Sequence, residues 1–90
     1  MDKKEAIKLI YKILLLYEDV INKDSVVTEE DYESYLERIY VRFLGKTPEI
    51  SETIYGLKTV GFKLTQPKVK SIVFHLISLI EKGGLVESGT

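Results

Sequence analysis

The chain has 90 residues, with 13 basic and 14 acidic side chains and a formal net charge of −1. This length corresponds to one domain, and a net charge near zero attracts neither nucleic acid nor anionic lipid by itself. With no cysteine and one histidine, the sequence excludes a disulfide framework, a thiolate metal site and a multi-histidine metal site.

Residues 2–22 have the spacing of an amphipathic helix. Two apolar rows lie side by side on one broad face: Ile7, Ile10, Leu14, Tyr17 and Ile21 in one, and Ala6, Leu9, Ile13, Leu16 and Val20 in the other. A face this wide must be covered by more than one partner helix. The longest apolar run, residues 13–17, is too short for a membrane span or a secretory signal, so we expect a cytoplasmic location.

Residues 28–44 predict a second helix. Thr28 is the expected N-cap, and the three acids that follow it suit the positive end of the helix dipole. The predicted core stripe consists of Tyr32, Leu36, Ile39 and Phe43, with Tyr40 and Leu44 beside it. Gly45 is the expected stop.

Two more helices are expected over residues 48–60 and 66–82. Pro48 and Pro67 suit a first helical turn, and Gly61 and Gly83–Gly84 suit helix ends. Gly56 is mid-helix, where it would permit close approach of a neighbouring helix. The buried side of the last helix is predicted to contain Val69, Ile72, Val73, Leu76, Ile77 and Ile80.

Four amphipathic helices with short connections favour an all-α fold, a single-domain antiparallel four-helix bundle. We expect the bundle over residues 1–84 and a short C-terminal tail over residues 85–90.

The residue types that enzymes use do not form a recognisable catalytic or cofactor site. His75 lies in a row of two serines and a lysine, which is typical of a surface histidine. The acids at 29–33 are explained by the helix dipole, so we expect no enzyme, no metal and no cofactor. Among the six tyrosines, Tyr11, Tyr35 and Tyr55 lie off the main stripes and are candidates for a binding surface.

Charge is segregated along the chain. Residues 18–37 contain eight acids and one lysine, whereas residues 38–70 contain seven bases and two acids. One interpretation is two solvated faces that stabilise each other. The other is a basic surface around Lys58, Lys63, Lys68 and Lys70 that meets phospholipid headgroups, nucleic acid or an acidic protein.

The C-terminal part of the chain resembles a DNA-binding pattern. "LTQPKV" followed by "LIEKGGLVE" is similar to the helix-turn-helix of winged-helix regulators, with Ile80, Gly84, Leu85 and Val86 at its ending. The spacing from Val69 to Gly84 is about one helical turn longer than in those regulators, and the helix is mostly apolar, whereas base recognition needs polar side chains.

The second resemblance covers more of the chain. "YLERIYVRFLGK" looks like the second-helix pattern of class IIa (pediocin-like) bacteriocin immunity proteins, and "FKLTQPKVKSIVFHL" looks like the start of their final helix. The residues that carry it are Leu36, Ile39, Tyr40, Val41 and Arg42, and then Lys63, Leu64 and Thr65. The resemblance implies a small cytoplasmic four-helix bundle that protects a bacteriocin producer at the inner membrane face, without catalysis.

Three hypotheses remain open: an immunity or other protein-binding bundle, an accessory or regulatory interaction module of phage or plasmid type, and a DNA-binding regulator. For the first, the expected partner is a protein, such as a membrane receptor–bacteriocin complex, with peripheral membrane contact. A homodimer stays open as well. The expected binding residues are Lys58, Lys63, Lys68, Lys70, Leu85 and Val86.

Overall fold

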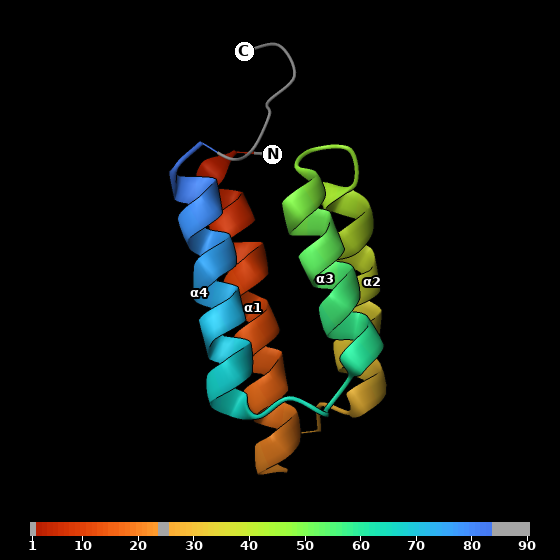
Figure 1. Cartoon of the computed structure of the whole chain (residues 1–90). Coiled ribbons are helices and arrows are strands. Elements are labelled where there is room, and N and C mark those ends of the chain that lie inside the picture. Colours follow the sequence, from red (N-terminus) through yellow and green to blue (C-terminus); the bar gives the residue numbers. More distant parts are fainter. Residues whose placement is uncertain (1, 24–25, 84–90) are drawn as a thin grey trace.

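The described residues fold into four α-helices and form no strand (Figure 1). This computed structural model describes residues 2–23 and 26–83. The helices are α1 (Lys3–Asn22), α2 (Glu29–Phe43), α3 (Pro48–Val60) and α4 (Gln66–Glu81). The predicted all-α four-helix bundle is confirmed, and each helix boundary lies within one residue of its expected position. The expected domain limit at residue 84 and the tail over 85–90 lie outside the described residues.

The bundle is built from two antiparallel helix pairs. α1 packs most extensively against α4, and α2 against α3, with fewer contacts joining one pair to the other. Figure 1 shows the α1–α4 pair beside the α2–α3 pair, with the α3–α4 connection crossing between them at one end. Antiparallel neighbours follow from short connections, because a short loop returns the chain alongside the helix it has just left.

Side-chain caps fix the first two helix starts. The Asp2 carboxylate accepts a 2.7 Å hydrogen bond from the backbone N–H of Glu5 at the start of α1. At α2, the Thr28 hydroxyl accepts from the Asp31 N–H and the Asp31 carboxylate accepts from the Thr28 N–H, which is a complete capping box. The expected N-cap at Thr28 is therefore confirmed.

The core lies along the axis of the bundle and takes side chains from all four helices. Fully buried members include Ile10 and Ile13 of α1, Leu36 of α2, Ile54 of α3 and Leu76 of α4. Of the predicted buried side of α4, Val69, Val73, Leu76 and Ile80 are buried, while Ile72 and Ile77 are partly buried against the core. Apolar burial of this kind is the main stabilising term for a small domain.

Four expectations about individual residues are wrong. Tyr35 is only 6 % exposed, so it belongs to the core and not to a binding surface. Leu44 is 56 % exposed because α2 ends one residue earlier, and Ile21 is 40 % exposed because it lies at the last turn of α1. No side chain or backbone comes within 4 Å of a β-carbon built at Gly56, so this glycine does not serve a close helix contact.

Candidate interaction surfaces

The α3–α4 connection is held in place by an aromatic cluster. Phe62 stacks on Tyr17 with ring centroids 5.1 Å apart, and Tyr32 lies 5.0 Å from Phe62 and 5.5 Å from Tyr17. The Tyr17 hydroxyl also donates a hydrogen bond to the backbone carbonyl of Leu64. Burial raises the pKa of both Tyr17 and Tyr32, so both phenols stay neutral at physiological pH. The connection is thus fixed to α1 and α2 by its own side chain and its backbone.

Lys58 is engaged by α2. Its ammonium lies 2.5 Å from the Glu37 carboxylate, and this hydrogen bond raises the pKa of Lys58. The pair lies in a surface hollow of about 440 Å³ lined by Glu33, Ser34, Glu37, Arg38 and Lys58. Two acids and two bases balance there, so this hollow does not concentrate positive charge around Lys58.

The remaining three lysines of the expected basic surface are exposed but face different ways. Lys63 lies in the α3–α4 connection, and Lys68 and Lys70 lie in the first turns of α4. Residues two apart on an α-helix are separated by about 200° around its axis. Lys68 and Lys70 therefore point to opposite sides of α4. That these four lysines bind a partner remains a prediction.

The fold brings parts of the acidic and basic stretches of the sequence close together. The acidic first turn of α2 and the α3–α4 connection lie at the same end of the bundle (Figure 1). At the same end of α4, the Gln66 amide donates to the Glu18 carboxylate at 2.5 Å. Between the described residues of the two stretches the structure gives one ion pair, Lys58 with Glu37, where α3 packs against α2.

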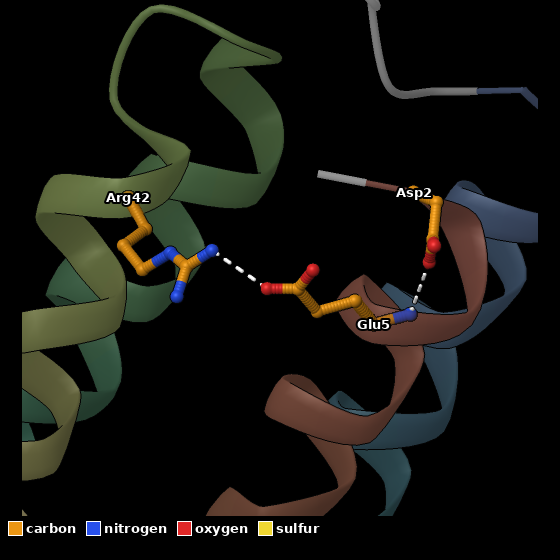
Figure 2. A network of polar contacts seen from close by, with 3 residues as sticks. All are labelled: Asp2, Glu5 and Arg42. Carbon is orange, nitrogen blue, oxygen red and sulfur yellow. Dashed lines mark hydrogen bonds and ion pairs between the residues drawn. The ribbon is translucent and has the colours of Figure 1, made fainter.

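Two polar contacts join the helix pairs at the opposite end. Arg42 of α2 donates a 2.7 Å hydrogen bond to the Glu5 carboxylate of α1. Figure 2 shows Glu5 held twice, through its carboxylate by Arg42 and through its backbone N–H by Asp2. His75 of α4 lies 3.4 Å from the Glu49 carboxylate of α3. Both pairs are about half exposed, so they contribute little to stability.

Exposed aromatic pairs lie on both helix pairs. Tyr11 of α1 and Phe74 of α4 have ring centroids 6.2 Å apart and are 40 % and 45 % exposed. On the other side, Tyr40 of α2 and Tyr55 of α3 are 5.6 Å apart, and Tyr55 is 55 % exposed. The exposure of Tyr11 and Tyr55 agrees with their predicted positions outside the core stripes. Exposure of Phe74 was not predicted, although Phe74 precedes His75 and lies one turn from both Ser71 and Ser78, on the polar side of the last helix.

Two of the six expected binding residues, Leu85 and Val86, lie outside the residues that the structure describes. Within residues 2–23 and 26–83, no three His, Cys, Asp or Glu side chains gather closely enough to hold a metal ion. Across the same ranges, no helix combines the length and the hydrophobicity that crossing a membrane requires.

Comparisons with known proteins return no relative. No protein-family model matches the chain, no curated protein matches it, and no solved structure matches its fold.

Proposed function

We propose that the chain is a non-enzymatic cytoplasmic binding protein that protects its cell from a class IIa (pediocin-like) bacteriocin. It would act at the inner face of the membrane, where the peptide has engaged its sugar-transporter receptor. The four-helix bundle supports this proposal, and so do the two stretches that resemble immunity proteins, residues 35–46 and 62–76. Leu36 and Ile39 of the second-helix pattern are buried, and Arg42 joins α2 to α1.

The observation that carries the proposal is the anchoring of the α3–α4 connection to α1 and α2. In the Lys63–Leu64–Thr65 step, the Leu64 carbonyl is held by Tyr17 and Thr65 is the N-cap of α4. Lys63 is exposed between Phe62, which stacks on Tyr17, and this anchored leucine. A charged side chain on a fixed backbone loses less conformational entropy on binding, so it suits recognition of an acidic partner.

The DNA-binding hypothesis is less well supported by α4. This helix buries Val69, Val73, Leu76 and Ile80 inside the bundle, mainly against α1. Its exposed side includes Phe74, and only a few polar side chains remain for base edges.

The test is protection of living cells. A sensitive strain that expresses the chain should survive the cognate peptide, whereas the same strain with an empty vector should not. The double substitution Lys63→Glu with Lys68→Glu should abolish protection while leaving thermal unfolding nearly unchanged.

A matched control is Arg38→Glu with Lys46→Glu, which changes the net charge equally. Arg38 is in the second half of α2, and Lys46 is in the α2–α3 connection, which lies at the opposite end of the bundle from the α3–α4 connection (Figure 1). The control should still protect. Unchanged killing of cells that contain the folded wild-type chain would refute the proposal.

A further inference from the structure

The outer side of the α1–α4 pair presents exposed apolar side chains on two adjacent helices. Tyr11, Leu15 and Phe74 are 40 %, 44 % and 45 % exposed. Leu15 is one helical turn beyond Tyr11, so both lie on the same side of α1, and the Tyr11 ring contacts the Phe74 ring across the pair. Three large apolar groups therefore form one patch that the fold leaves uncovered.

Lysines surround this patch. Because α1 and α4 are antiparallel and Tyr11 meets Phe74, Lys70 lies one turn from Phe74 in the direction of Leu15. Lys4 and Lys8 continue the side of α1 that bears Tyr11 and Leu15. We call these six residues the α1/α4 face: Lys4, Lys8, Tyr11, Leu15, Lys70 and Phe74.

The α1/α4 face is basic as well as apolar. Residues 6–17 of α1 and 66–80 of α4 contain no acid. The nearest acids in sequence on the same sides of the two helices are Glu18 and Asp19, within one turn beyond Leu15, and Glu81 at the end of α4. None of its three lysines forms an ion pair with a carboxylate of the described residues.

We propose that the α1/α4 face docks on the surface of a bilayer that contains anionic phospholipid. Each lysine would meet a lipid phosphate, while the two rings and Leu15 enter the boundary between headgroups and acyl chains. Two helices lying side by side present a nearly flat surface, and α1 alone is about 30 Å long. Lysine, aromatic and leucine side chains in one plane all interact favourably with the surface of an anionic bilayer.

Other occupants fit the α1/α4 face less well. A second copy docked through the same face about a twofold axis would bring lysines against lysines. The phosphates of a nucleic acid would attract the lysines, but they would not bury the apolar surface of Leu15. On the α2–α3 side, Tyr40 and Tyr55 lie near the neutral Glu37–Lys58 pair, and no charge there selects an occupant.

This inference deepens the proposed function by naming the surface that meets the membrane. It uses Lys4 and Lys8 of α1, whereas the protection assay uses Lys63 and Lys68. Vesicle binding is measured on purified protein without bacteriocin or receptor, so each proposal can fail while the other succeeds.

The experiment is flotation of the purified full chain with two kinds of vesicle. One kind contains phosphatidylglycerol and phosphatidylcholine in equal parts, and the other contains phosphatidylcholine alone. The chain should float with the first and stay behind with the second. Lys4→Glu with Lys8→Glu should weaken binding at least about 25-fold, since each neutralised lysine costs about fivefold. Leu15→Ser with Phe74→Ser should weaken it about tenfold or more.

Matched controls come from the other helix pair. Arg38→Glu with Lys46→Glu changes the net charge as much as the lysine variant, and Val41→Ser with Leu44→Ser removes exposed apolar area from α2 and its end. Both should bind nearly as tightly as wild type, with circular dichroism showing that every variant folds.

Four outcomes would overturn the proposal. They are absence of wild-type flotation with the phosphatidylglycerol vesicles, equal losses in the control variants, and tighter binding to an oligonucleotide than to the vesicles. The fourth is a dimer in solution that dissociates on Leu15→Ser with Phe74→Ser, because this would assign the face to a second copy.

Discussion

The phenol of Tyr35 on α2 donates a 2.7 Å hydrogen bond to the backbone carbonyl of Leu9 on α1. This bond joins the two helix pairs at a position where the tyrosine ring is 6 % exposed. The Lys12 ammonium lies 5.2 Å from the centre of the same ring, so a cation covers its outer side. A tyrosine that periodicity assigns to the edge of α2 thus joins α1 to α2.

The first prediction concerns this hydrogen bond. Tyr35→Phe keeps the buried ring and removes its hydroxyl, so the free energy of unfolding should fall by about 1 kcal/mol. Urea denaturation followed by circular dichroism measures the change. A variant as stable as wild type would show that the Tyr35–Leu9 bond adds no net stability.

The second prediction has the opposite sign. Tyr32 is fully buried, and its hydroxyl has no hydrogen-bond partner in the part of the chain that the structure describes. An unsatisfied buried hydroxyl is costly, so Tyr32→Phe should raise the free energy of unfolding by roughly 1 kcal/mol. The same denaturation experiment compares both variants, and a loss of stability at Tyr32→Phe would contradict the assignment.

The third prediction is alkaline destabilisation. Burial raises the pKa of Tyr35 from 10.0 to about 12, an effect that nearby Arg38 and Arg42 partly offset. Between these two values the folded chain holds a proton that the unfolded chain has released. The free energy of unfolding should therefore have its full value below about pH 10 and fall as the pH rises toward 12.

Burial raises the pKa of Tyr32 in the same direction, so both phenols contribute to this loss. Melting temperatures measured across the alkaline range test the prediction. The fall should be shallower in Tyr32→Phe and in Tyr35→Phe, because each variant removes one of the titrating groups. A melting temperature that is constant up to pH 12 would contradict it.

The fourth prediction compares two N-caps. Thr28→Ala removes the hydroxyl that accepts the Asp31 N–H, and it should lower the free energy of unfolding by about 1 kcal/mol. Thr65 is the N-cap residue of α4, but its side chain makes no capping hydrogen bond. Thr65→Ala is therefore the control and should change stability less than Thr28→Ala. Equal losses would mean that the capping box does not stabilise α2.

The candidate surfaces were predictable only in part. Lys63, Lys68 and Lys70 are exposed, as predicted for a basic surface, and Tyr11 and Tyr55 are exposed, as predicted from their positions outside the core stripes. The pairing of Lys58 with Glu37 was not predictable, because 21 residues separate them and only the packing of α2 against α3 brings them together.

The sequence by itself determined the four helices, their ends to within one residue, and most of their buried side chains. Apolar periodicity, the Thr28 cap and the prolines act within one or two turns, so they operate before any helix meets another. Tertiary structure alone decided that α1 pairs with α4, that Tyr35 is buried against Leu9, and that Lys58 meets Glu37. These relations depend on which helix faces meet, and that choice rests on long-range packing of the whole core.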